Sequence, residues 1–346
     1  SASAFDDAAH PVRRAFEAEL PRLAPALAAA HGCDPTLRSL VGATHSRAAR
    51  DVVSSLVAVL GDLPVARRGD GLWSGAKALY DAAARDIPGR AQDLLVPALS
   101  DATPADFEAV LPDLLLELDD ANLGEAFRKA AASLRRSKTT TPSSAAVVTL
   151  DAAHVVVALH RVAVPAGASS KRATEALTVC LAARDVFGAV TLRDALDRMT
   201  TPLPGGGDTA SSPSKDDAPP AARAKELPAM LMRTAILAVK TYPSQLTGFV
   251  AHTVLARLVN RFAVWHNPGL WKGFVICCTM LADEHGANCF DALLALPAAQ
   301  LKDVLKIAAK LKLPLKRHAE KELARNKTTI AAPVLRLLGA KAPGGY

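Results

Sequence analysis

Apolar residues recur at helical spacing along most of the chain. The clearest stripes repeat every three or four residues, and no long stretch alternates apolar and polar positions as a half-buried strand does. The pattern therefore predicts an all-α protein. Four of the stripes are Leu20, Leu23 and Leu27; Val52, Val53, Leu56, Val59 and Leu60; Leu94, Leu95, Ala98 and Leu99; and Leu301, Val304, Leu305, Ala308 and Leu311.

Helix breakers divide this pattern into predicted helices of about 10 to 18 residues. Pro21 interrupts the first stripe. Thr103 is a predicted N-cap whose side chain accepts a free backbone N–H, with Pro104 in the first turn and Asp106 at the positive end of the helix dipole. The string of short helices favours antiparallel hairpins in an array, as in a HEAT or armadillo α-solenoid. A compact irregular helical domain is the alternative, because no motif repeats at a fixed period.

Composition divides the chain into segments. We predict an N-terminal helical segment over residues 1–79 and a larger helical domain over residues 80–338. Two polar stretches interrupt the larger domain. Residues 137–144 read as a short connector, and residues 202–226, rich in Gly, Ser and Pro, have so little to bury that we expect them to be disordered.

Length and composition are typical of a soluble globular protein with a large core. Of 346 residues, 50% are hydrophobic and 22% are charged. The longest run without Asp, Glu, Lys or Arg, Thr241 to Ala256, is too short to span a bilayer. No apolar signal core opens the chain, and its start at Ser1 indicates an excerpt of a longer protein. Five sparse cysteines suit reduced thiols in the cytosol or nucleus.

The positive charge is concentrated at the C-terminal end. From Leu301 onward, eleven Lys and Arg face three acidic residues, a net of +8, whereas the whole chain carries only +7. Lys302, Lys306 and Lys310 are spaced four residues apart and form a predicted stripe on one helix face that could contact RNA or an acidic partner. A solvated helix face is the plainer interpretation. The cations that follow this stripe are Lys316, Arg317, Lys321 and Arg325.

No set of residues in the sequence is typical of an enzyme. The only glycine run, Gly205 to Gly207, lacks the Lys and Ser or Thr of a phosphate-binding loop. Ser74 and Lys77 match a Ser-x-x-Lys pattern, but the Ser-Asp-Asn and Lys-Thr-Gly elements of that chemistry are missing. The sequence therefore predicts no catalytic site and no cofactor.

One group of residues offers zinc-ligand types: Cys277, Cys278, His285 and Cys289. Paired Cys-x-x-Cys knuckles are absent from it. Cys277 and Cys278 also lie in an apolar helical stretch, where small thiols pack well. We therefore predict buried core thiols here and no metal.

Six of the 15 aromatic residues lie within one 33-residue window, at Tyr242, Phe249, Phe262, Trp265, Trp271 and Phe274. This density indicates either a well-packed core or a place where a partner docks. Trp265 and Trp271 do not share a helical face, and Pro268 lies between them, so we expect one of them in the core. The window holds too few cations, Arg257, Arg261 and Lys272, to follow an RNA backbone.

The sequence around this window resembles a known family. It carries Leu231-Met232-Arg233-Thr234 before the window and a Trp-x-x-Pro-x-x-Trp-x-Gly-Phe element from Trp265 to Phe274 within it. With Tyr242-Pro243, Gly248-Phe249-Val250 and Leu294-x-Leu296-Pro297, these motifs resemble the C-terminal domain of the symplekin family in order and spacing. The resemblance covers about Tyr80 to Glu322 and is strongest from Leu227 to Leu301.

The resemblance implies a non-catalytic helical scaffold in the nucleus, a subunit of the pre-mRNA 3'-end cleavage and polyadenylation machinery. The implied partners are the C-terminal domains of the metallo-β-lactamase-fold endonuclease subunit and of its inactive homologue, with the cleavage stimulation factor as a further candidate and RNA contacted only indirectly or weakly. An RNA-binding helical module that uses the basic C-terminal face is the alternative. The candidate partner-binding residues are Arg233, Tyr242, Phe249, Trp265, Trp271 and Phe274. For Arg233 we favour a buried ion pair over a partner contact.

Overall fold

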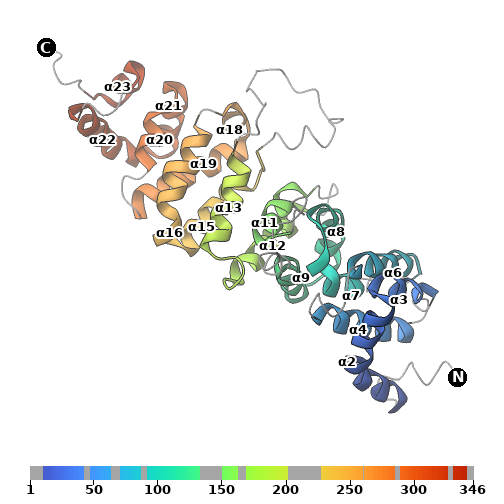
Figure 1. Ribbon diagram of the computed structural model, residues 1–346. Helices are drawn as coiled ribbons and strands as arrows, with labels where there is room; N and C mark the ends of the chain where they lie inside the picture. The colour runs from blue at the N-terminus through green and yellow to red at the C-terminus, as the bar shows by residue number, and fades with distance from the viewer. Residues whose placement is uncertain are drawn as a thin grey trace, which may run out of the picture. The chain divides into compact units, whose positions relative to one another are not determined.

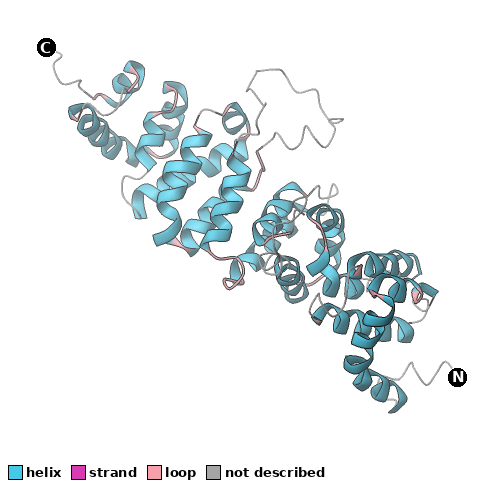
Figure 2. Ribbon diagram, in the orientation of Figure 1, coloured by secondary structure: helices cyan, strands magenta, loops and turns pink. Residues whose placement is uncertain are grey.

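The computed structural model is helical throughout the residues it describes, which confirms the predicted all-α class; Figure 2 shows helices joined by loops, with no strand in this part of the chain. The described residues are 11–42, 47–63, 71–86, 92–132, 150–162, 169–201, 227–259, 261–284, 289–325 and 330–340. The predicted connector 137–144 and the predicted disordered stretch 202–226 lie outside them. The chain divides into two compact units, Ser1–Val186 and Phe187–Tyr346.

The first unit contains nine described α-helices and one 3₁₀ helix, coloured blue to green in Figure 1. Its longest helix, α2, has 21 residues and its shortest, α7, has four, a wider range than the sequence predicts. The elements are α2 (Pro11–His31), α3 (Cys33–Arg38), α4 (Arg47–Asp62), α6 (Leu72–Asp86), α7 (Gln92–Leu95), the 3₁₀ helix η2 (Val96–Asp101), α8 (Pro104–Glu117), α9 (Asp120–Ala132), α11 (Ala152–Arg161) and α12 (Ser169–Ala182).

The buried face of α2 differs from the predicted one. Leu20 is buried, but Leu23 and Leu27 are more than one-third exposed, and Ala24 and Ala28 take the core positions. These positions repeat every four residues and so share one face of α2, which packs on α4 and α3. Pro21 also does not break the helix, because α2 continues through it and through Pro25.

Two other predicted features of the first unit are confirmed. The Leu94, Leu95, Ala98 and Leu99 stripe is fully buried. The Thr103 hydroxyl accepts the backbone N–H of Asp106 (3.2 Å), while the Asp106 carboxylate accepts the backbone N–H of Thr103 (3.1 Å). This reciprocal pair is a capping box, and it sets the start of α8.

Close backbone packing joins α3 to α6. A Cβ atom on Gly75 would stand 2.8 Å from the Leu37 Cβ, so only glycine fits at this point of α6. The Ser74 hydroxyl donates to an Asp34 carboxylate oxygen (2.7 Å) beside this contact. That hydrogen bond lowers the pKa of Asp34.

The second unit contains the aromatic window and the basic C-terminal end. Figure 1 shows α13, α15, α16 and α19 side by side, and contacts between the pairs α13–α15, α15–α16 and α15–α19 agree with that view. The elements are α13 (Ala189–Thr200), α15 (Leu231–Thr241), α16 (Pro243–Phe249), the π-helix η3 (Val250–Leu255), α17 (Ala256–Leu258), α18 (Phe262–His266), α19 (Pro268–Glu284), α20 (Phe290–Leu294), α21 (Ala298–Ile307), the 3₁₀ helix η5 (Ala309–Leu311), α22 (Lys312–Ala324) and α23 (Ala332–Leu338).

Helices α15 and α19 meet at a glycine. A Cβ atom on Gly273 would lie 2.6 Å from the Met232 Cβ, a separation that real atoms do not reach. Met232 and Gly273 belong to two of the motifs that carry the family resemblance. Their contact gives a physical reason for both residue types and fixes the base on which the aromatic side chains stand.

Candidate protein-interaction surfaces

The ring of Trp271 stands on the ring of Phe274. The two centroids are 5.5 Å apart and the planes differ by 7°. Phe274 is fully buried, whereas Trp271 is half-buried. Residues three positions apart lie on one side of a helix, so Phe274 supports the Trp271 ring from the core side and holds part of it at the surface.

Trp265 lies on α18, and the break before Pro268 falls where the sequence predicts it. The Asn267 side chain accepts the backbone N–H groups of Gly269 (3.0 Å) and Leu270 (3.1 Å) and so caps α19. Trp265 is half-buried, and its indole N–H is buried without a hydrogen-bond partner in the described part of the chain.

The expectation that one of the two tryptophans lies in the core is therefore wrong. Both are half-buried. Val264 and Leu270, their neighbours in sequence, are 1% and 2% exposed and fill the core positions instead. The smaller aliphatic side chains pack inward at the break between α18 and α19, and the indole rings remain partly at the surface.

Tyr242 and Phe249 contact the beginning of the second unit. The Tyr242 hydroxyl donates to the backbone carbonyl of Phe187 (3.2 Å). The Arg193 guanidinium lies 5.0 Å from the centre of the Phe249 ring, within cation–π range. Both aromatic residues are half-buried, and these contacts connect α16 to α13 and the residues before it.

Two arginines of the aromatic window bind the C-terminal end of α13. Arg257 forms an ion pair with Asp197 (2.7 Å), and Arg261 donates to the backbone carbonyl of Thr200 (2.7 Å). A cation at this position satisfies a helix-terminal carbonyl and interacts favourably with the negative end of the helix dipole. These side chains are engaged within the unit, a role that the sequence did not reveal.

The interpretation of Arg233 as a buried ion pair is wrong. Arg233 is exposed on α15 and forms no ion pair with any described residue. Its neighbours Met232 and Thr234 are buried, as expected from the 100° rotation between successive helical residues. The side chain remains available to a partner.

The predicted stripe of Lys302, Lys306 and Lys310 is also not continuous. Helix α21 ends at Ile307, and Ala308 has φ −126° and ψ 64°, outside the helical region. Lys310 therefore lies on the separate 3₁₀ turn and forms an ion pair with Asp283 of α19. Lys302 and Lys306 alone share the face of α21.

Carboxylates neutralise part of the remaining basic segment. Lys306 pairs with Asp303 (3.5 Å), Lys316 with Glu320 (3.8 Å) and Arg325 with Glu322 (3.3 Å). The candidates that form no ion pair with a described residue are Lys302, Arg317 and Lys321, all exposed.

The cysteines of the predicted thiol group are buried, as the sequence predicts. Cys277, Cys278 and Cys289 are fully buried, and the Cys289 thiol donates to the Cys278 carbonyl (3.3 Å). Burial raises the pKa of Cys277 to about 12 and also raises that of Cys278. No three His, Cys, Asp or Glu side chains of the described residues form a possible metal site; His285 lies outside that part of the chain.

Ser74 and Lys77 do not act as a pair. The Ser74 hydroxyl is bound to Asp34, and Lys77 forms an ion pair with Asp81 one helical turn away. In the Ser-x-x-Lys pattern the lysine serves the serine, whereas here each of the two side chains is bound to a different carboxylate. Both residues therefore have structural roles: Ser74 binds Asp34 of α3, and Lys77 binds Asp81 within α6.

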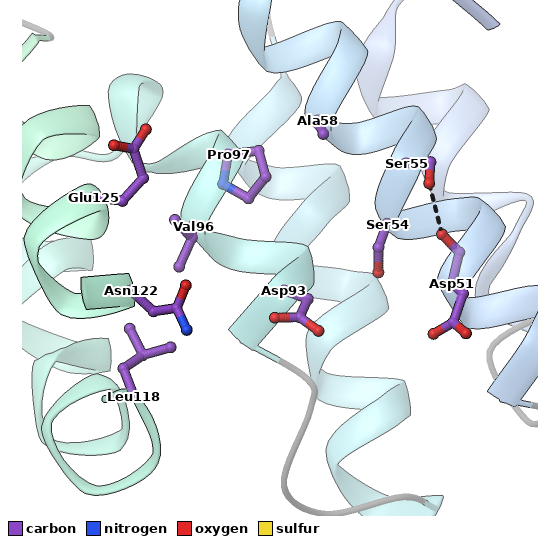
Figure 3. A pocket seen from close by; sticks show the side chains of 10 residues that line it. All are labelled: Asp51, Ser54, Ser55, Ala58, Asp93, Val96, Pro97, Leu118, Asn122 and Glu125. Carbon is purple, nitrogen blue, oxygen red and sulfur yellow. Dashed lines mark hydrogen bonds between the residues drawn. The ribbon is translucent and has the colours of Figure 1, made fainter. Parts of the chain in front are cut away.

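A cleft of about 400 Å³ lies within the first unit, and carboxylates dominate its polar lining. Figure 3 shows Asp51 and the two serines on α4, Asp93 on α7, and Asn122 and Glu125 on α9, with Val96 and Pro97 between them. The Ser55 hydroxyl donates to the Asp51 carbonyl (3.0 Å). None of the described lining residues is a cation or a histidine.

Helices are the only regular elements among the described residues, and none of those helices is long and apolar enough to cross a membrane. The half-buried indole rings and the exposed cations make the second unit a helical module with candidate surfaces for protein interaction.

Comparison with known proteins identifies the family. The family model described as symplekin tight junction protein C terminal matches residues 92–308, more than half of the chain. The chain therefore belongs to the symplekin C-terminal family, a family of non-catalytic scaffolds, and symplekin is a scaffold of polyadenylation. No curated protein and no solved structure matched the chain.

Proposed function

We propose that the chain is a scaffold subunit of the nuclear pre-mRNA 3'-end cleavage and polyadenylation machinery and that it holds the C-terminal domains of the endonuclease subunit and of its inactive homologue. The cleavage stimulation factor is a further proposed partner. The observation that carries the proposal is the family match over residues 92–308, which contains the whole aromatic window.

Within this proposal, the candidate residues divide into two roles. Arg233, Trp265 and Trp271 are exposed or half-buried, and they would contact a partner. Tyr, Trp and Arg side chains dominate the binding energy of many protein interfaces. The remaining candidates, Tyr242, Phe249 and Phe274, hold the surface in place through their contacts within the second unit.

The finer architecture belongs to the same proposal. We infer stacked antiparallel hairpins of the HEAT or armadillo type, with a helical segment at residues 1–79 followed by the symplekin-like domain at 80–338. Packing of α2 on α4, of α3 on α6 and of α11 on α12 supports short-range stacking in the first unit.

Co-purification of the chain with the two C-terminal domains from the same organism tests the proposal. At about 0.15 M salt, where screening removes weak surface attraction, we expect a stoichiometric complex on size-exclusion chromatography. Separate elution of components that circular dichroism shows to be folded would overturn the proposal.

A charge reversal then tests the surface. Arg233→Glu is expected to weaken the complex about tenfold or more, because it replaces an exposed cation on α15, the helix that packs on α19, with a charge that repels an acidic partner. Arg336→Glu makes the same change on the exposed face of α23 and serves as the control. Equal affinities of the two variants would remove Arg233 from the contact surface.

A further inference from the structure

The turn between α21 and α22 exposes two large aliphatic side chains. Ile307, the last residue of α21, is 64% exposed, and Leu313, in the first turn of α22, is 58% exposed. Only five residues separate them. We call the surface formed by residues 302–317 the α21–α22 corner. Exposed aliphatic residues that occur singly need no explanation, but two on one short turn mark a candidate interaction site.

The backbone of this corner is fixed by the core beneath it. The Ala308 N–H donates to the Val304 carbonyl (2.8 Å), and the Leu311 N–H donates to the Ala308 carbonyl (3.0 Å). Ala308, Leu311 and Leu315 are buried, at 7%, 1% and 0% exposure. Ile307 and Leu313 therefore stand on a turn whose backbone is held by buried neighbours. Because that backbone is already ordered, binding loses little conformational entropy there.

Exposed cations lie within five residues of the two aliphatic side chains in the sequence. Lys302, Lys312 and Arg317 are exposed and form no ion pair with described residues. Only Asp303 among residues 302–317 is acidic, and it pairs with Lys306. A partner that covers Ile307 and Leu313 would meet positive charge near them. Negative charge on the partner would therefore raise its association rate and help to fix its orientation in the complex.

We propose that the α21–α22 corner binds an acidic segment of a protein partner that carries large aliphatic side chains. This inference rests on the proposed scaffold function and names the chemistry of one of its contacts. The corner extends past residue 308, where the family match ends. The contact therefore does not follow from the match alone.

Protein is the favoured class of ligand over RNA for two reasons. First, single-stranded RNA is bound by stacking of bases on aromatic or planar side chains, and residues 298–325 contain no Phe, Tyr or Trp. The ring of His318 packs against Phe290 and binds Asp291 (2.8 Å). Second, ion pairs already occupy Lys306, Lys310 and Lys316, which leaves isolated cations where a phosphate backbone needs a continuous row.

The test measures affinity of the whole chain for the C-terminal domains of the endonuclease subunit and its homologue. Ile307→Ser with Leu313→Ser removes the aliphatic pair, and Lys302→Glu with Arg317→Glu reverses the charge. Both double variants change exposed positions, and circular dichroism confirms their folding. Val190→Ser, at a side chain that is 75% exposed on α13, and Arg161→Glu with Arg184→Glu, at exposed positions of the first unit, are the matched controls.

We expect each double variant to weaken the complex at least tenfold and both controls to bind as the unchanged chain does. Binding that neither double variant alters would overturn the inference and leave the scaffold function intact. If the unchanged chain does not bind, the scaffold function itself fails and this inference fails with it.

Two further results would overturn the inference by naming another occupant. If only the charge variant weakens binding, and a 20-nucleotide oligouridine competes for the site in a salt-dependent way, the corner is a nucleic-acid surface. If the free chain dimerises and the aliphatic double variant is monomeric in light scattering, a second copy of the chain occupies the corner.

Discussion

The two units share a way of holding helices together but differ in surface charge. Residues 1–186 contain 20 Lys and Arg against 22 Asp and Glu, whereas residues 187–346 contain 21 against 12. The first unit is thus close to neutral and the second carries a net charge of +9. Because helix packing is alike in both, the surfaces, and not the cores, distinguish what the two units can bind.

An arginine from a later helix binds the end of an earlier helix in each unit. Arg172 of α12 donates to the Leu115 carbonyl (3.0 Å) and to the Leu118 carbonyl at the end of α8, and it pairs with Asp120. In the second unit, Arg261 binds the Thr200 carbonyl at the end of α13. Both contacts satisfy carbonyls that a helix leaves free.

The surfaces of the units show the contrast. The cleft of the first unit is lined by Asp51, Asp93 and Glu125. The second unit has the half-buried indoles and, at the α21–α22 corner, two exposed aliphatic residues with exposed cations nearby in the sequence. We therefore expect the second unit to favour acidic partners.

The largest expected effect is a loss of unfolding free energy when a core phenylalanine is truncated in either unit. Phe127 and Phe274 are fully buried in the first and second units respectively. Truncation of either to Ala should cost about 3–5 kcal/mol of unfolding free energy. In scanning calorimetry, each variant should lower the transition of its own unit. One shared transition that both variants lower equally would show that the units unfold together.

The next effect tests the arginine contacts. Arg172→Met keeps much of the packing but leaves the carbonyls of Leu115 and Leu118 without this donor, so we expect a loss of about 1–3 kcal/mol in urea unfolding. Arg261→Met should cost less, because the described carbonyl contact of Arg261 is to Thr200, whereas Arg172 binds both Leu115 and Leu118. A larger loss for Arg261→Met would contradict the parallel drawn between the two units.

A glycine pair tests the contact between α15 and α19. Gly273→Ala should destabilise the chain by about 1–3 kcal/mol, because the new Cβ would collide with Met232. Gly248→Ala is the matched control on α16, where nothing lies within 4 Å of the added atom, and it should stabilise by about 0.4–1 kcal/mol. Thermal melts in which both variants shift in the same direction would refute the predicted close contact.

The smallest effect concerns pH and the first unit. Burial lowers the pKa of His160, and a hydrogen bond to the Val156 carbonyl only partly opposes this. The unfolded chain therefore takes up the proton first, and stability falls as the pH drops below about 6.5. The loss of melting temperature between about pH 7.5 and 5.5 should be smaller in His160→Gln. An unchanged difference would exclude His160 as its source.

Helical class and several local features could be predicted from the sequence because they depend on neighbouring residues. The N-cap at Thr103 and the break before Pro268 are examples. The core face of α2 was predicted incorrectly, because leucine is more apolar than alanine but Ala24 and Ala28 are the buried residues there.

Contacts between distant residues could not be predicted in this way. Arg257 and Asp197 are 60 positions apart, and Tyr242 and Phe187 are 55 apart, so no spacing rule connects them. The basic stripe was predicted as continuous because lysines four apart suit a helix. The non-helical backbone of Ala308 interrupts it. The family resemblance was confirmed, since its motifs are long and include packing partners such as Met232 and Gly273.

The central claim is that the second unit makes the partner contact. Hydrogen–deuterium exchange of the chain, alone and bound to the C-terminal domains of the endonuclease subunit and its homologue, tests this claim most directly. Our account predicts new protection in the second unit, at the aromatic window and at the α21–α22 corner. Protection confined to the first unit, around the cleft lined by Asp51, Asp93 and Glu125, would contradict it.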